Sequence, residues 1–369
     1  MVKTKNDNKY VLIMAGGSGS RLYPRSTDDL PKQFQQIIGE KTLIEQAYDR
    51  ARRIVADDHI YVSSNHKYID LIKKYLPNIL SENYITEPVK RNTGPAISLA
   101  TAIIYKKDPK AVIVATHSDH LVLKIDEYEK VIKTGIKVVQ KKTNHILCIG
   151  ITPTSPHTGL GYIEKDKKFA QVDGSIVFST KRFVEKPNLD LAKQYVSSGN
   201  FFWNAGYFIW QAKHFLGELK KYDLKLYNGV TKIAEAKGSK NFIKTLDKEF
   251  IKFKDIAVDH LIMEKTPNLL VLPVDIGWSD IGSWDVVADM VDVNEKDVHG
   301  NYSKGMVINI DTHNTIIFSH DNAKVIATIG LDNYIIVTTE EAIVIVPRGR
   351  SEDVKNIVLE LGKRRTDEI

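Results

Sequence analysis

The chain has 369 residues with 43% hydrophobic and 27% charged side chains, which is enough for a sizeable core and for two domains. Its net charge of +6 is spread along the sequence, so we expect no nucleic-acid partner, and a single cysteine excludes internal disulfides and cysteine-based zinc sites. No apolar run approaches the roughly 20 residues that span a bilayer, so we expect a cytoplasmic protein without a membrane partner.

The first predicted strand is the apolar run 10–14, and the glycine-rich loop 15–24 follows it. Glycines at the carboxyl end of a strand let backbone amides approach an anion, and Arg21 and Lys32 add positive charge. The spacing fits neither a dinucleotide fingerprint nor a P-loop, because Leu22 stands where the third fingerprint glycine belongs and no Gly-Lys-Ser/Thr follows. We therefore predict a cradle for a nucleotide triphosphate, with a ligand-free glycine turn as the alternative.

The order of the elements indicates an α/β domain followed by a β-rich one. Short apolar runs alternate with amphipathic segments up to about residue 150, which predicts a mostly parallel sheet, and residues 151–290 continue that domain. After residue 298 short strands are broken by polar turns, and a terminal helix is expected to begin with Ser351 as its N-cap. The ranges expected are strands at 60–63, 111–115, 161–164, 183–185, 306–310, 315–318, 324–327, 334–337 and 342–346, and helices at 43–55, 96–105, 128–139, 215–226 and 241–250.

Two acidic residues are predicted to hold a metal ion. Asp119 follows the strand 111–115 at the sheet edge that carries the glycine loop, and Asp280 lies in a loop rich in glycine and tryptophan. Carboxylates together with phosphate oxygens are the ligands that Mg²⁺ prefers, although Asp119 could instead cap the following helix. His117 and His120 are more typical of turn residues than of zinc ligands.

Three further segments offer groups for a sugar phosphate. Glu185 and Lys186 end a strand and point to opposite faces, so that one suits a hydroxyl and the other a phosphate. Asn204 lies among aromatic residues, a composition typical of carbohydrate pockets, with core packing as the alternative. Gly161 allows the backbone to approach a ligand closely.

The segment 87–96 is a candidate site for the base. It ends at a predicted helix start, with Asn92 or Thr93 as the cap,. Polar groups ahead of this cap, including Glu87, would then be free to face a nucleotide base.

The ordered set of these motifs resembles the bacterial mannose-1-phosphate guanylyltransferases, also called GDP-mannose pyrophosphorylases. The motifs follow the order of the family through about the first 290 residues. This chain departs from the pattern at Tyr23, where Trp is usual, at Gly94, where Ala is usual, and at His117, where Pro is common. None of these departures removes a charged group. The motifs are 16–22 with 31–34, Glu87-Pro88 with 91–93, Ser118-Asp119-His120, Glu185-Lys186-Pro187, 203–206 and 277–284.

The resemblance implies a fold and a reaction. It implies a Rossmann-like nucleotidyltransferase domain with a mixed, mostly parallel sheet over residues 1–295. Over 296–369 it implies a small all-β domain of the left-handed β-helix kind, ending in a short helix and often involved in dimerisation, so we expect a homodimer. The reaction is GTP + α-D-mannose 1-phosphate → GDP-mannose + pyrophosphate. The isomerase domain of longer members does not follow, so that second activity is not expected.

The residues and the resemblance together suggest roles for the candidate groups. The catalytic residues would be Arg21 and Lys32 on the triphosphate and Lys186 on the sugar phosphate; Gly161, Glu185 and Asn204 would bind the sugar, and Asp119 and Asp280 would bind Mg²⁺. Glu87 suits the N–H donors of guanine, with Asn92 or Thr93 assisting, although backbone groups of the glycine loop could do the same. The expected nucleotide-binding residues are Ala15, Gly16, Gly17, Ser18, Gly19, Ser20, Glu87, Asn92, Thr93 and Ser118.

Two alternatives keep the same fold. The enzyme could use another sugar 1-phosphate, such as a manno-heptose, with the same machinery. A non-catalytic subunit that senses a sugar nucleotide is the other alternative, and it predicts the loss of charged groups that this chain retains at Arg21, Lys32, Asp119 and Asp280. A nicotinamide dehydrogenase is disfavoured because the third fingerprint glycine is absent.

Overall fold

The computed structural model describes residues 8–17, 19–319 and 324–367, and the chain forms two compact units. The first unit consists of Met1–Gly16, Glu45–Ser118 and Val122–Trp278, and the second of Gly17–Ile44, Asp119–Leu121 and Ser279–Ile369. Each unit is therefore assembled from segments that are far apart in the sequence. The domain boundary expected at residue 295 remains a prediction. Among the described residues, no helix is long and apolar enough to cross a membrane.

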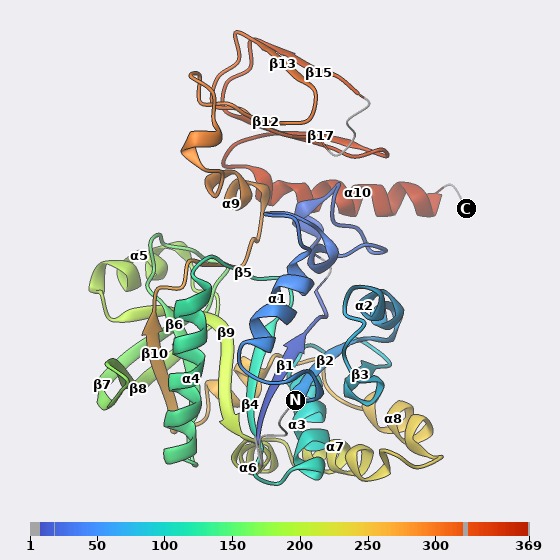
Figure 1. Ribbon diagram of the computed structural model, residues 1–369, viewed down its shortest axis with the longest axis vertical. Helices are drawn as coiled ribbons and strands as arrows, with labels where there is room; N and C mark the ends of the chain where they lie inside the picture. The colour runs from blue at the N-terminus through green and yellow to red at the C-terminus, as the bar shows by residue number, and fades with distance from the viewer. Residues whose placement is uncertain (1–7, 18, 320–323, 368–369) are drawn as a thin grey trace. The chain divides into compact units, whose positions relative to one another are not determined.

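The first unit is built on a nine-stranded mixed sheet with the strand order β3-β2-β1-β4-β9-β6-β10-β8-β7. Strand β1 lies between β2 and β4 and is parallel to both, while β9 is antiparallel to β4 and β6 (Figure 1). Continuous apolar runs form the central strands because both faces of the sheet are covered. The strands are β1 (Lys9–Met14), β2 (Ile60–Asn65), β3 (Tyr84–Glu87), β4 (Val112–His117), β6 (Ile146–Ile151), β7 (Tyr162–Val172), β8 (Ser175–Val184), β9 (Phe201–Gln211) and β10 (Leu269–Val274). The predicted α/β fold is confirmed.

The predicted helices up to residue 250 are present with shifted ends and one break, whereas the helices Ile69–Tyr75 and Leu189–Ser198 were not predicted. The helix predicted over 215–226 is two helices, because the chain leaves helical geometry at Asp223, whose side chain accepts a hydrogen bond from Leu226 N at 2.9 Å and caps the second helix,. A π-helical turn, η6, covers Asp259–Met263. The helices are α1 (Leu43–Arg52), α2 (Ile69–Tyr75), α3 (Thr93–Lys107), α4 (Ile125–Lys141), α5 (Leu189–Ser198), α6 (Ala212–Tyr222), α7 (Leu224–Ala236) and α8 (Phe242–Phe250).

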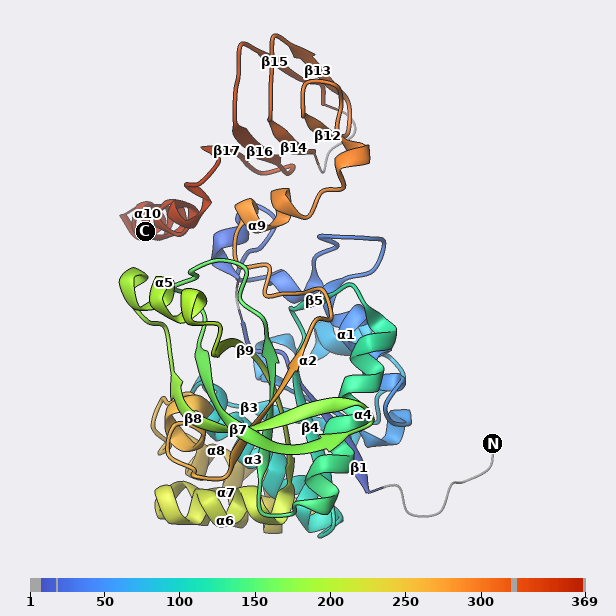
Figure 2. The same cartoon turned by 90° about the vertical axis from the view of Figure 1, so that its left-hand side faces the viewer.

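The strands of the second unit form two small sheets. Consecutive strands alternate between them: β12, β14 and β16 are parallel neighbours in one, with β17 antiparallel at its edge, and β13 pairs in parallel with β15 in the other. Figure 2 shows these two sheets as two layers. The strands are β12 (Tyr302–Lys304), β13 (Val307–Ile310), β14 (Ile316–Ser319), β15 (Ile326–Ile329), β16 (Tyr334–Thr338) and β17 (Ile343–Pro347). This arrangement confirms the predicted all-β, β-helix-like domain.

The core of the second unit joins its distant segments. Leu22 of the glycine loop is fully buried in one apolar cluster with Ile316, Ile335 and Trp284. Trp284 begins helix α9 (Trp284–Asp289), and its Nε1 donates a hydrogen bond to Tyr23 O at 2.9 Å. The loop after β1 thus shares a core with the β-strands near the other end of the chain.

Ser351 does not cap the terminal helix, contrary to the prediction. It begins a short 3₁₀ turn, η8 (Ser351–Asp353), ahead of α10 (Val354–Asp367), and it makes no side-chain cap there. Its hydroxyl instead donates to the carboxylate of Asp285 at 2.5 Å and accepts from Asp285 N at 2.9 Å, at the start of α9. The hydroxyl therefore satisfies an unpaired N–H of a different helix.

Candidate active site

The glycine loop has a backbone that only glycine accommodates at one position. Gly19 has a φ of 65° and precedes the 3₁₀ turn η1 (Ser20–Leu22). A Cβ built on Gly19 would lie 2.4 Å from the Cβ of Lys32, so the absence of a side chain lets the two backbone segments approach each other. Gly17 lies near Asp119, with 3.7 Å between its hypothetical Cβ and Asp119 Oδ2. Ser18, also predicted to bind nucleotide, lies outside the described residues.

Lys32 joins the two predicted metal ligands within the second unit. Its side chain is only 6% exposed, and its ammonium lies 2.9 Å from Asp119 Oδ2. The same ammonium donates a hydrogen bond of 2.5 Å to the main-chain oxygen of Asp280. A buried cation needs such partners because desolvation is costly. Three residues separated in sequence, each predicted to act on phosphate or metal, therefore meet at one point.

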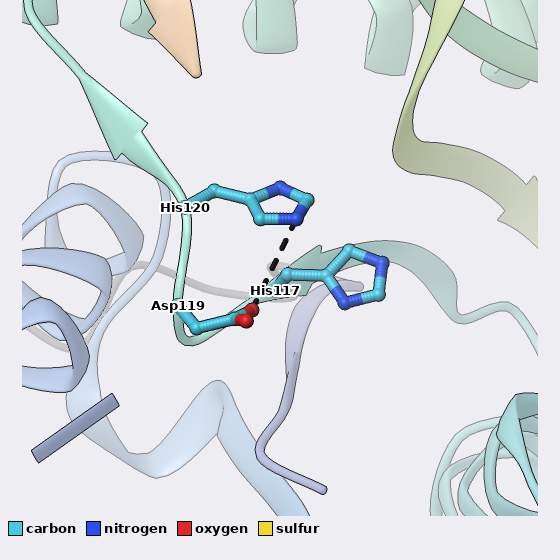
Figure 3. A group of neighbouring side chains, drawn as sticks. All are labelled: His117, Asp119 and His120. Atoms are coloured by element: carbon cyan, nitrogen blue, oxygen red, sulfur yellow. Dashed lines mark ion pairs between the residues drawn. The ribbon is translucent and has the colours of Figure 1, made fainter. Parts of the chain in front are cut away.

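The residues of this group suit a hard divalent cation. Asp119 offers carboxylate oxygens to this group, whereas Asp280 reaches Lys32 with its main-chain oxygen, so a carboxylate contact of Asp280 with a metal ion stays a prediction. Phosphate oxygens of a nucleotide would add to the oxygen-rich set that Mg²⁺ prefers. Figure 3 shows His117, the last residue of strand β4, and Asp119 and His120, which follow the strand; its dashed line marks the ion pair of 3.9 Å between His120 Nε2 and Asp119 Oδ1. His117 Nε2 would lie 2.6 Å from a Cβ on Gly206. His117 is the last residue of β4 and not a turn residue as expected, and its ring packs closely against Gly206.

Arg21 forms a long-range ion pair. Its Nη1 donates to Oε1 and Oε2 of Glu352, at 2.8 and 2.9 Å, within the second unit. The Arg21 side chain is 39% exposed and that of Glu352 is 54% exposed. No local sequence pattern relates these residues, which lie 331 positions apart.

The three predicted sugar-binding residues lie together in the first unit. Asn204 N donates to Gly161 O at 2.8 Å, and a Cβ on Gly161 would lie 2.5 Å from Glu185 Oε2. Glu185 therefore sits over a glycine that leaves room for its carboxylate. Lys186 has a φ of 46° and forms an ion pair of 2.7 Å with Glu185. Its side chain is 63% exposed, so the ammonium remains accessible.

Asp259 is a member of this group that the sequence analysis missed. Its Oδ1 accepts a hydrogen bond of 3.0 Å from Asn204 Nδ2, while Asn204 Oδ1 accepts from Gly206 N at 2.9 Å and from Cys148 Sγ at 3.3 Å. Burial, followed by the charge of Glu185, raises the pKa of Asp259 to about 6. Asp259 begins the π-helical turn, a feature often found at functional sites,. The sequence signal was a single acid among the mostly apolar residues 257–263.

Glu87 is the predicted base-reading residue with the most unusual environment. It ends strand β3, is 7% exposed and accepts a hydrogen bond of 3.1 Å from Ser63 Oγ. Burial raises the pKa of Glu87 to about 7. Ser63 O also accepts from Ala15 N at 2.8 Å, so the Glu87 partner is tied to the start of the glycine loop. A carboxyl group that titrates near neutrality is a candidate functional group.

The side chains of Asn92 and Thr93 have structural partners. Asn92 is the N-cap of α3, as predicted: its Oδ1 accepts from Thr93 N at 2.9 Å, and its Nδ2 donates to Asp255 Oδ1 at 3.2 Å. Thr93 Oγ1 accepts from Val258 N at 3.0 Å. Ser118 is almost fully buried, and its N–H donates to Met14 O at 3.0 Å. These three residues therefore support the backbone around the candidate site, and their contact with a nucleotide remains a prediction.

Comparisons with known proteins agree with this arrangement. Residues 10–297 match the nucleotidyl transferase family, and residues 305–361 match the MannoseP isomerase/GMP-like beta-helix domain. The mannose-1-phosphate guanylyltransferase of Escherichia coli K12 is 32% identical over 353 residues, which cover 95% of this chain and 72% of that protein. The alginate biosynthesis protein AlgA of Pseudomonas fluorescens is 33% identical over 362 residues, covering 97% of this chain and 72% of that protein.

A solved structure has the same fold over almost the whole chain. The mannose-1-phosphate geranyltransferase of Thermus thermophilus superimposes with a TM-score of 0.84 at 23% identity, covering 96% of this chain and 99% of that one. This likeness concerns the fold, whereas the sequence relatives establish the family. The chain is an enzyme of the nucleotidyl transferase family and belongs with the mannose-1-phosphate guanylyltransferases.

Proposed function

We propose that this sugar-phosphate nucleotidyltransferase uses GTP and α-D-mannose 1-phosphate and forms GDP-mannose and pyrophosphate. The observation that carries the proposal is the contact of the buried Lys32 ammonium with Asp119 and Asp280. It supports a centre that binds phosphates and a cation together. The names of the relatives supply the substrate pair.

The sugar phosphate is itself the nucleophile, so the site needs no general base. Its oxygen attacks the α-phosphorus of the nucleotide while the bond to pyrophosphate breaks and the leaving group carries away the negative charge. Catalysis then depends on alignment and on fixed positive charge. Lys32 and Arg21 provide that charge near the glycine loop, and Lys186 orients the phosphate of the sugar.

Asp119 and Asp280 would hold Mg²⁺, and the ion would supply positive charge to the phosphate oxygens. In the structure Lys32 neutralises the Asp119 carboxylate. This pairing orients the carboxylate of Asp119 before a cation binds. The role of the two acids as cation ligands is part of the proposal.

The sugar hydroxyls would be bound by Glu185, by Asn204 and by the backbone at Gly161. Asp259 orients the amide of Asn204 by accepting one of its N–H groups, and the other N–H, which has no partner among the residues that the structure describes, would donate to a sugar hydroxyl,. Glu87 would accept hydrogen bonds from the N–H groups of the guanine edge.

A homodimer remains our expectation, and light scattering of the purified chain tests it.

Pyrophosphate release from a matrix of substrates tests the proposed function. GTP, ATP, UTP and dTTP are each paired with mannose, glucose and manno-heptose 1-phosphates, with and without Mg²⁺. We expect release with GTP and mannose 1-phosphate that is lost when EDTA removes the cation. Faster turnover with the heptose phosphate would reassign the sugar, and release only with UTP and glucose 1-phosphate would refute the specificity. No release with any pair would favour a sensing subunit.

A further inference from the structure

Glu352 contacts the predicted catalytic Arg21, and neither the sequence motifs nor the family resemblance assigns it a role. It lies in η8, directly ahead of α10, and both of its carboxylate oxygens accept hydrogen bonds from Arg21 Nη1. Elements η1 and α10 also pack against each other within the second unit. The C-terminal segment therefore reaches the phosphate loop through a charged side chain.

The geometry of this ion pair leaves most of the guanidinium available. A guanidinium carries five N–H donors, two of them on Nη1. Glu352 engages only Nη1, and the N–H groups on Nε and Nη2 of Arg21 have no hydrogen-bond partner among the described residues. Nε and Nη2 form one edge of the planar group, and such an edge binds phosphate oxygens in the bidentate manner.

The backbone next to Arg21 is held by the same unit. Leu22 is fully buried in the core that contains Ile316 and Ile335, and Tyr23 O accepts the hydrogen bond from Trp284 Nε1. What the backbone does not restrain is the long side chain of Arg21, which has many rotamers. Glu352 is the group that restrains it.

We propose that Glu352 is a positioning residue for nucleotidyl transfer: it holds Nη1 of Arg21 so that the Nε and Nη2 edge faces the phosphates of the nucleotide. The inference rests on the proposed function and extends it, because it gives the C-terminal β-rich segment a part in the phosphate site. Both side chains are partly exposed. Solvent weakens such a pair, so we expect a contribution of about 2- to 5-fold in binding.

The test uses the full chain with Glu352→Ala, Glu352→Gln and a matched control, Asp353→Asn. Asp353 is the neighbouring acid at the same end of α10, but it pairs with Arg350 at 2.9 Å. We measure the Kd of inorganic tripolyphosphate by calorimetry and the KM values for GTP and mannose 1-phosphate. Glu352→Ala should weaken tripolyphosphate binding and raise the KM for GTP by about 2- to 5-fold, with the KM for mannose 1-phosphate unchanged. Glu352→Gln should lose less, because its amide oxygen still accepts from Nη1, and Asp353→Asn should match the wild type.

A double-mutant cycle with Arg21→Ala separates positioning from a general structural effect. If Glu352 acts through Arg21, adding Glu352→Ala to Arg21→Ala should not weaken tripolyphosphate binding further. The proposal is overturned if Glu352→Ala weakens tripolyphosphate binding as much in the Arg21→Ala background as in the wild type. It is also overturned if Glu352→Ala has the same effect on binding as Asp353→Asn, or if Glu352→Ala tightens binding. A wild type that binds tripolyphosphate but releases no pyrophosphate with any substrate pair would refute the proposed function, while the binding cycle would still decide the role of Glu352.

Discussion

Replacing Asp259 with Asn should raise the unfolding free energy relative to the wild type, and this difference should be larger at alkaline pH than at acidic pH. Burial and the nearby charge of Glu185 raise the pKa of Asp259 from 3.8 to about 6. The folded state therefore binds this proton more tightly than the unfolded state. The unfolding free energy falls as pH rises from about 4 through about 6, and it stays lower above that range.

The size of the effect follows from the pKa. A rise from 3.8 to about 6 corresponds to at most about 3 kcal/mol of unfolding free energy, and partial exposure of the carboxylate reduces this to about 2 kcal/mol. Asn is nearly isosteric, and its side-chain oxygen still accepts the hydrogen bond from Asn204 Nδ2. The stability difference between Asp259→Asn and the wild type should therefore grow by about 2 kcal/mol between pH 4 and pH 8.

Urea unfolding at pH 4, 6 and 8 measures this difference for the wild type and Asp259→Asn. Asp247→Asn is the matched control, because Asp247 is an exposed acid on α8, and its stability difference should stay constant with pH. A constant difference for Asp259→Asn, or the same growth for Asp247→Asn, would refute the reasoning. Asp259→Ala removes the acceptor of Asn204 and should raise the KM for mannose 1-phosphate about tenfold.

Three further variants address the other groups. In the wild type, GTP should bind more tightly as pH rises from 6 to 8, because the pKa of Glu87 is raised to about 7 and the ionised carboxylate is the stronger hydrogen-bond acceptor. Glu87→Gln cannot ionise and should lose this pH dependence. Calorimetric affinities that change equally with pH in both proteins would contradict this. Lys32→Met should lower kcat/KM on the order of 100-fold and the unfolding free energy by about 2 kcal/mol, since it leaves Asp119 without its cation,; unchanged turnover would exclude Lys32 from catalysis. Gly19→Ala should lower the thermal unfolding temperature, because its Cβ meets another side chain at 2.4 Å and its φ is 65°,. Gly16→Ala, whose Cβ has no atom within 4 Å, is its control and should change that temperature less.

The sequence predicted those features that depend on local patterns. Continuous apolar runs predicted the central strands, and Asn92 ahead of a helical pattern predicted the N-cap of α3. The candidate sugar group also came from short motifs, and the structure brings Gly161, Glu185 and Asn204 together. The parallel strands β1 and β4 place their carboxyl ends at one sheet edge, which is why the glycine loop and Asp119 could be assigned to that edge from the sequence,.

The features that the sequence missed depend on contacts between distant segments. The partner of Ser351 is Asp285, and that of Arg21 is Glu352, and neither pairing has a spacing rule. Asp259 was missed because its importance comes from Asn204, which lies 55 residues earlier. The composition of the second unit was not predicted for the same reason. The helical or strand periodicity of residues 17–44 carries no information about a core shared with the C-terminal β-strands.

The long separation between Arg21 and Glu352 has a consequence for biosynthesis. Leu22 leaves the ribosome early, but the side chains that bury it, Ile316 and Ile335, are translated near the other end of the chain. At about 5–20 residues per second, the 331 positions between Arg21 and Glu352 take roughly 15 to 70 s to synthesise. During that interval the glycine loop can pack against Ile37, Leu43 and Leu121 but lacks the part of its core that the C-terminal strands supply, so this core is completed only as translation finishes.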